Sequence, residues 1–191
     1  RHWLYFRANG EDTLEVRVTG ADGKLLGRGE AAIRRVAPGR PLVGLISPVG
    51  GGVPETTDAE RGPRQVMARP ENLPDRWFGY DGLACLVWVE PEPEALTATQ
   101  AAALTKWLRR GGRLIVVCLD AVANIRGTFL EPLLPVVIER TRPTDLTEFF
   151  KKLGAREDAV RVTACMAQTT GGVDLGAKQS APPGVFVRAR R

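Results

Sequence analysis

Two short, nearly continuous apolar runs flank a helical pattern in the middle of the chain. The runs are LACLVWV at 83–89 and RLIVVCL at 113–119, with EPEPEALTATQAAALTKWLRRGG between them. Strands covered on both faces of a parallel sheet show such continuous apolar runs. The stretch therefore predicts a strand, a helix and a second, parallel strand, and the rest of the chain is organised around this βαβ unit.

The helix of this unit carries clear start and stop signals. Thr97 and Gln100 have the spacing of a capping box, in which each side chain bonds the other residue's backbone N–H. Four apolar residues then recur at helical spacing and predict the buried stripe, namely Ala101, Leu104, Trp107 and Leu108. Gly111 suits the left-handed position after the last turn, and Gly112 leads into the next strand.

Further apolar runs extend the α/β pattern over residues 41–191. We expect strands at 41–47, 64–69, 136–140, 159–166 and near the end of the tail 169–191, a short helix at 129–135, and a helix at 144–153 capped by Thr144.

Residues 1–40 show a different pattern, with partial alternation of apolar and polar positions. Asn9-Gly10 and Asp22-Gly23 are dipeptides typical of hairpin turns. This segment predicts an antiparallel β appendage of two to four strands, either an edge extension or the remnant of a β-sandwich. The chain begins at Arg1 and ends in VFVRARR, and we expect it to be either a processed protein or a domain of a longer one.

Composition and charge exclude few classes of function. The net charge is +5, from 27 Lys and Arg against 22 Asp and Glu, and the basic residues are spread along the chain. Nucleic-acid binding proteins gather basic residues on one face, so we do not expect a nucleic-acid partner. No apolar run approaches the roughly 18–20 residues that a membrane span needs.

The segment from Tyr80 to Val117 resembles the central part of class I glutamine amidotransferase-like domains, in particular divergent versions in bacterial envelope proteins. The resemblance rests on Tyr80-Asp81 before the first strand, Gln100 near the helix start, and Trp107 with Gly111-Gly112 at the helix end. It extends more weakly over about residues 41–190. It implies a flavodoxin-like three-layer α/β/α sandwich with a mostly parallel sheet. The shared motif concerns packing and is not itself catalytic.

Catalysis by a cysteine of this fold requires a base beside the nucleophile and a strained elbow of small residues around it. The candidate nucleophile is Cys118, which follows a strand but lacks flanking glycines, whereas Cys85 and Cys165 lie within apolar runs. The one histidine is His2, in the β appendage. We therefore interpret the thiols as small buried apolar groups; the alternative is one disulfide in an extracytoplasmic protein.

Ligands of open α/β sheets bind at the carboxyl ends of the strands. Four residues are candidates there, namely Ser47, Glu90, Cys118 and Asp120. If the protein is an enzyme, Cys118 or the Glu90/Asp120 carboxylate pair would be at its centre. Gly50 and Gly51 lie in a glycine-rich loop at 48–53 that lacks a phosphate-binding signature. We interpret it as a connecting loop; the alternative is a small-anion site with Ser47, Gly50 and Gly51.

Together these features predict a non-catalytic glutamine amidotransferase-like module that serves as an interaction or scaffold domain. Its partner would be another protein or other domains of the same longer chain, on the extracytoplasmic side of a bacterial membrane. We expect no cofactor, because neither a metal-ligand spacing nor a nucleotide-binding motif is present. The alternatives are a cysteine- or carboxylate-dependent hydrolase or amidotransferase, and a binder of a small anionic ligand.

Overall fold

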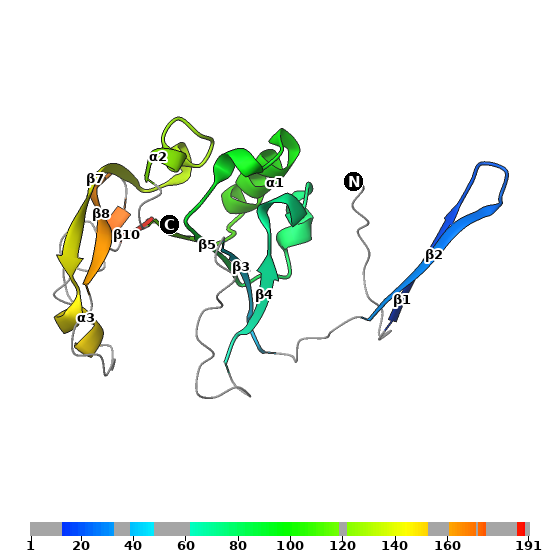
Figure 1. Ribbon diagram of the computed structural model, residues 1–191, viewed down its shortest axis with the longest axis horizontal. Helices are drawn as coiled ribbons and strands as arrows, with labels where there is room; N and C mark the ends of the chain where they lie inside the picture. Colours follow the sequence, from blue (N-terminus) through cyan, green and yellow to red (C-terminus); the bar gives the residue numbers. More distant parts are fainter. Residues whose placement is uncertain are drawn as a thin grey trace.

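A computed structural model of the chain describes residues 13–32, 39–47, 62–118, 122–152, 161–170, 172–174 and 187–189 (Figure 1). The fold is α/β: a parallel sheet of four strands is accompanied by three antiparallel strand pairs within these ranges. No helix in the described ranges is both long and apolar enough to cross a membrane.

The parallel sheet is built from the apolar runs that the sequence marks as strands. Its order is β4-β3-β5-β6, formed by β4 (Arg64–Ala68), β3 (Leu42–Ile46), β5 (Cys85–Val89) and β6 (Leu114–Val117). All three neighbouring pairs are parallel. The predicted βαβ unit is confirmed, because β5 and β6 lie side by side with α1 (Ala98–Arg109) between them in the sequence.

Helix α1 begins and ends where its capping residues predict. The Gln100 N–H donates to the Thr97 hydroxyl at 3.3 Å, and the Thr97 N–H donates to the Gln100 side-chain oxygen at 2.9 Å. At the other end Gly111 has φ +101°, a conformation that costs glycine little. The buried side of the helix holds Leu104 and Trp107, which pack with Trp88 of the sheet in one hydrophobic core.

The central strands of the sheet are better covered than its edge strands. On the α1 side, Ile46, Leu86 and Trp88 are each 1% exposed. On the other side Leu45 and Val87 of the central strands are buried, but Met67 of β4 is 46% exposed and Ile115 of β6 is 50% exposed. The expectation of strands covered on both faces therefore holds for β3 and β5 and is wrong for the two edge strands.

Short helical turns connect the strands and close the core. They are η1 (Pro70–Asn72), η2 (Trp77–Tyr80), η3 (Pro93–Ala95), α2 (Val122–Ile125) and η4 (Glu131–Leu133). Leu73 and Tyr80 of the first connection, with Ile125 and Leu130 of the later one, are fully buried in the α1-side core. The short helix expected at 129–135 is thus a single 3-10 turn around Pro132.

The C-terminal half adds two antiparallel pairs. These are β7 (Val136–Asp145) with β8 (Arg161–Thr169), and β9 (Gly172–Asp174) with β10 (Val187–Ala189). The expectation that Thr144 caps a helix is wrong, because Thr144 pairs with Val162 inside the β7–β8 ladder. The helix α3 (Thr147–Lys152) starts later, and the Asp145 carboxylate accepts from the Thr147 N–H at 2.9 Å.

The cap of α3 predicts a pH dependence of stability. Hydrogen bonds from the Thr147 side chain and then its backbone, helped by Arg161 and Lys151, lower the pKa of Asp145 below 3.8. The unfolded chain then binds more protons than the folded one in this acid range, so the contribution is present above pH 3.8 and is lost as the pH falls through the folded pKa. We expect Asp145→Asn to lower the free energy of unfolding at neutral pH, and this difference should shrink in acid. Denaturant unfolding of both proteins across pH measures it; a difference that stays constant with pH would contradict it.

The N-terminal part forms one hairpin within the described residues, as the alternating pattern predicts. It joins β1 (Thr13–Thr19) to β2 (Leu25–Ala32) in antiparallel pairing. The Asp22-Gly23 turn is confirmed, with Gly23 at φ +77° and the Asp22 carboxylate accepting from the Lys24 N–H. In Figure 1 the hairpin extends away from the parallel sheet. The Asn9-Gly10 dipeptide lies outside the described residues.

Candidate functional site

The carboxyl edge of the parallel sheet brings three of the predicted site residues to one place. Ile46 pairs with Trp88, and Val89 pairs with Val117, so the residues that follow these strand ends emerge together. They are Ser47 after β3, Glu90 after β5 and Cys118 after β6. The other candidates at this edge, Asp120, Gly50 and Gly51, lie outside the described residues.

Glu90 has the most unusual backbone at this edge. Its φ is +46°, and no other non-glycine residue in the described ranges has a positive φ. Its N–H donates to the Val117 carbonyl at 2.8 Å, which extends the β5–β6 ladder by one bond, and the following Pro91 is fully buried. A left-handed conformation costs a non-glycine residue roughly 1–2 kcal/mol. The fold therefore holds Glu90 in place from both sides.

The side chain of Glu90 is the second unusual feature of this residue. It is half-buried at the strand end, and its carboxylate makes no hydrogen bond or ion pair within the part of the chain that the structure describes. Strained backbone of this kind occurs disproportionately at functional sites. The sequence placed Glu90 at this edge but gave no sign of its φ.

Cys118 is held by a contact that the sequence did not indicate. Its carbonyl oxygen accepts the thiol hydrogen of Cys165, with 2.8 Å between sulfur and oxygen. Cys118 itself is half-buried and packs against the hydrophobic core, and Cys85, Cys118 and Cys165 form no disulfide with one another. The contact joins β8 to the end of β6 across 47 positions of sequence. The alternative of a disulfide is not realised in this structure.

Metal-binding groups do not collect around these residues within the described ranges. No three His, Cys, Asp or Glu side chains there lie close enough to hold a metal ion. His2 and Asp120 both lie outside the described residues, so the structure places neither of them relative to Cys118.

The residues that carry the family resemblance form a connected packing unit. The Tyr80 ring stacks on Trp107, with 5.4 Å between the ring centroids and 28° between the planes. The other neighbour of the indole is Gly112, where an added Cβ would lie 2.5 Å from Cε2 and 2.6 Å from Cε3 of Trp107. Because Gly112 has no side chain, the backbone that leads into β6 can pass directly against the Trp107 ring. The Tyr80 hydroxyl donates to the Pro74 carbonyl at 3.1 Å.

Gln100 ties α1 to the same unit. The side chain is 4% exposed, and its amide nitrogen donates to the Leu73 carbonyl at 2.8 Å and to the Glu71 carbonyl at 3.3 Å. Its oxygen closes the capping box with Thr97. The capping role was predicted, whereas the contacts to the 70–73 turn, 27 or more positions away, were not.

A shallow hollow of about 540 Å³ lies beside this unit, at the amino ends of β5 and β6. Trp77 and Trp107 line it, together with Arg110 and Arg113. Arg110 is stacked over the Trp77 ring, 4.2 Å from its centroid. The predicted burial of Trp107 is confirmed, since it is 4% exposed, and Trp88 is 1% exposed. Trp77 is half-buried and supports a surface cation.

We compared the chain with known proteins. No family model, curated protein or solved structure matches it significantly.

These residues fall into two groups at opposite ends of the strands. Ser47, Glu90 and Cys118 lie at the carboxyl edge, where α/β sheets usually bind ligands. The unit of Tyr80, Trp107 and Gly112 lies near the amino edge and is engaged in packing.

Proposed function

We propose that this chain is a non-catalytic glutamine amidotransferase-like module that acts as an interaction or scaffold domain of a larger bacterial, envelope-associated protein. The observation that carries the proposal is the role of the residues in the resemblance. Gln100, Tyr80, Trp107 and Gly112 are all engaged in packing or capping around α1. These residues can stabilise the fold in a protein that has no catalytic activity.

The state of Cys118 supports the same proposal. The Cys118 backbone accepts the Cys165 thiol, and the residue is half-buried against the core. This environment is typical of a cysteine used as a small apolar group.

We further propose that the parallel sheet belongs to a flavodoxin-like three-layer sandwich. Helix α1 covers one face of the sheet. On the other face Leu45 is 1% exposed and Val87 is 9% exposed, which is the burial that a second covering layer would produce. The envelope location rests on the resemblance, as does a protein partner or a neighbouring domain of the same chain.

Alkylation kinetics and a glutaminase assay test the non-catalytic proposal. Iodoacetamide should modify Cys118 no faster than Cys85, which is also half-buried and serves as the internal control. Purified protein should release no ammonia from glutamine, and Cys118→Ser should behave like the wild type. Rapid, selective alkylation of Cys118, or glutamine hydrolysis that Cys118→Ser abolishes, would overturn the proposal.

Glu90 supports a second candidate, a carboxylate-dependent hydrolase. Its strained φ of +46° and its carboxylate without a partner in the described ranges are what this candidate needs. Glu90 with Asp120 would act in acid/base work or hold Mg²⁺. Calorimetric titration with Mg²⁺ tests the metal-dependent form of this candidate: binding that Glu90→Gln abolishes favours it, and no binding rules that form out.

The backbone strain at Glu90 gives a prediction of its own. Glu90→Ala removes the carboxylate but leaves a residue with a Cβ atom in the left-handed conformation. Glu90→Gly removes both the carboxylate and the Cβ atom. We expect the glycine variant to be more stable than the alanine variant by about 1 kcal/mol. Denaturant unfolding of the two variants measures this difference. Equal stabilities would mean that the conformation costs nothing.

A further inference from the structure

The β1–β2 hairpin is amphipathic, and the outer edge of β1 is unpaired within the residues that the structure describes. Every residue of β2 is exposed, and β1 pairs with no other strand in the described ranges. Along β1 the apolar residues Leu14, Val16 and Val18 alternate with polar ones, so the two kinds occupy opposite faces. A two-stranded hairpin is marginally stable alone in water, and an unpaired strand edge is a ready template for a further strand.

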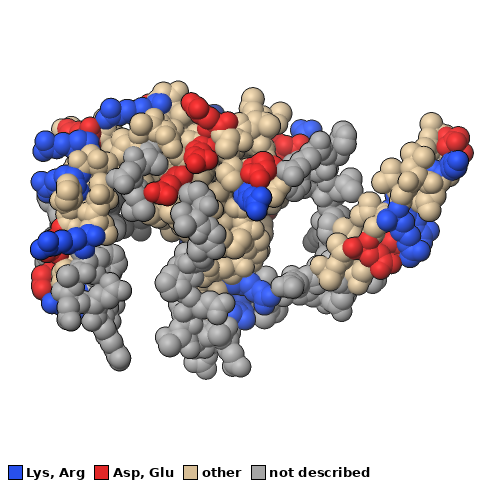
Figure 2. All heavy atoms as spheres, in the orientation of Figure 1, with Lys and Arg blue, Asp and Glu red and all other residues tan. Residues whose placement is uncertain are grey.

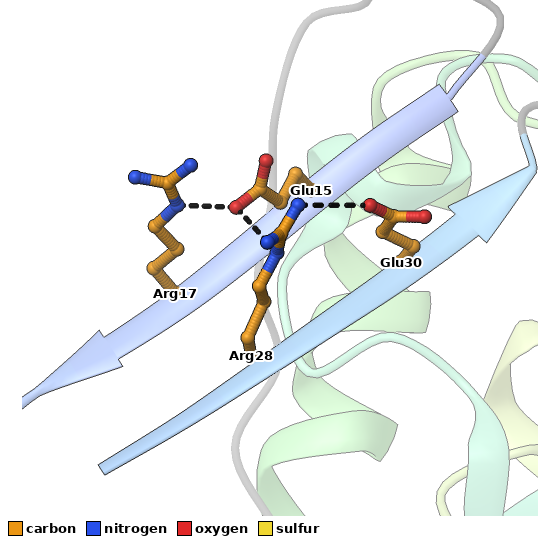
Figure 3. A network of polar contacts seen from close by, with 4 residues as sticks. All are labelled: Glu15, Arg17, Arg28 and Glu30. Carbon is orange, nitrogen blue, oxygen red and sulfur yellow. Dashed lines mark hydrogen bonds and ion pairs between the residues drawn. The ribbon is translucent and has the colours of Figure 1, made fainter. Parts of the chain in front are cut away.

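The charges of the hairpin are poorly matched within its own register. Glu15 lies directly opposite Glu30, and Arg17 lies directly opposite Arg28. Like charges in directly opposed positions are destabilising. Contacts along and across the strands offset this (Figure 3): Arg28 contacts Glu15 at 2.9 Å and Glu30 at 3.2 Å, and Arg17 contacts Glu15. In Figure 2 acidic and basic side chains accordingly lie next to one another on the hairpin.

The sequence of β1 is complementary to itself in antiparallel orientation. It reads TLEVRVT, with Val16 at its centre. Pairing with an identical strand about a two-fold axis at Val16 sets Glu15 opposite Arg17 of the second copy, and Arg17 opposite its Glu15. The same register sets Leu14 opposite Val18 and Thr13 opposite Thr19. All seven positions therefore meet a residue of matching character, as an isologous contact requires.

We propose that β1 is a self-association edge, at which two copies of this chain pair their β1 strands in antiparallel register about Val16. The resulting sheet has the order β2-β1-β1-β2. Its charged face opposes Glu15 to Arg17 at both central positions, and its apolar face joins Leu14, Val16 and Val18 of both copies. Four strands with one apolar face pass the size at which small sheets become stable.

The outer edge of β2 is less suited to this contact. Arg28 and Glu30 are also symmetric about Gly29, but Gly27 and Gly29 leave β2 without side chains at two positions. Glycine weakens a strand interior, whereas the β-branched residues of β1 favour it. The proposal does not depend on whether the α/β part is catalytic, so failure of one leaves the other standing.

Charge reversal at β1 tests the proposal with the intact chain. Glu15→Arg gives β1 two basic residues, and Arg17→Glu gives it two acidic residues. In either variant the two central pairs of the dimer become like-charged, so we expect dimerisation to weaken roughly tenfold or more. Each reversal removes ion pairs of Glu15 or Arg17 within the hairpin, but it also places opposite charges across one β1–β2 position. Recovery of the dimer in an equal mixture of the two variants is the control for loss of the hairpin.

Sedimentation equilibrium at low salt, from micromolar to millimolar protein, gives the readout. We expect the wild type to dimerise, each variant alone to stay monomeric at the same concentration, and an equal mixture of the two variants to dimerise again. Raised salt should weaken the wild-type dimer. A wild type that is monomeric throughout, a dimer that ignores both reversals, or a mixture that fails to associate would each overturn the proposal.

Discussion

Gly112→Ala is expected to destabilise the α/β part by about 3 kcal/mol, near the upper end of the usual cost of overpacking a core. The new methyl group would lie 2.5–2.6 Å from ring atoms of Trp107, closer than carbon atoms can approach. Tyr80 stacks on the indole at a centroid distance of 5.4 Å, so a shift of the ring would disturb this contact as well. Urea unfolding of the variant and the wild type, followed by tryptophan fluorescence, measures the loss.

Gly82→Ala is the matched control for this prediction. It is the same substitution at the turn before β5, where an added Cβ meets nothing within 4 Å and φ is not positive. We expect no loss there, or a gain of about 0.4–1 kcal/mol from the stiffer unfolded chain. In a Trp107→Leu background Gly112→Ala should cost less by about 1 kcal/mol or more, because the ring is gone. Equal costs in both backgrounds would show that the strain lies elsewhere.

Local sequence patterns were sufficient for the elements around α1. The capping box at Thr97 and Gln100, the left-handed Gly111 and the parallel β5–β6 pair all appear as expected. The capping box and the Gly111 turn depend on residues that are close in sequence. The β5–β6 pair is indicated by two continuous apolar runs. Helical periodicity does the same for Leu104 and Trp107, which lie in the core.

The pattern misleads where tertiary pairing overrides local propensity. Thr144 precedes a run of apolar residues at helical spacing, yet it lies in strand β7 and pairs with Val162 of β8. Helix α3 therefore begins at Thr147, whose N–H donates to the Asp145 carboxylate. Nothing within a few residues of Thr144 reports the strand at 161–169, so the boundary could not be placed from this segment alone.

The candidate site was predictable in position and not in detail. Parallel strands must end at one edge, so Ser47, Glu90 and Cys118 come together once β3, β5 and β6 are adjacent. The positive φ of Glu90 contradicts the preference of a residue before proline for extended backbone. It follows from tertiary constraints, namely the ladder bond to Val117 and the burial of Pro91.

Gln100→Leu is the second change with a large expected effect, a loss of roughly 2–4 kcal/mol. Leucine has a similar volume, so the substitution mainly removes hydrogen bonds. The Leu73 carbonyl loses its 2.8 Å donor, and the Thr97 N–H loses its 2.9 Å acceptor. A buried polar group without a partner bears its full desolvation cost. Thermal and urea unfolding measure the change.

Thr97→Ala and Gln100→Glu separate the two roles of this side chain. Thr97→Ala removes only the cap and should cost about 1 kcal/mol. Gln100→Glu aims a carboxylate at the carbonyls of Glu71 and Leu73, which favours the protonated acid and raises its folded pKa. The folded state then binds more protons, so this variant should be most stable below the unfolded pKa of about 4.3 and lose stability as the pH rises through the folded pKa. If Gln100→Leu cost no more than Thr97→Ala, the bonds to the 70–73 turn would contribute nothing, and Gln100 would be a capping residue alone.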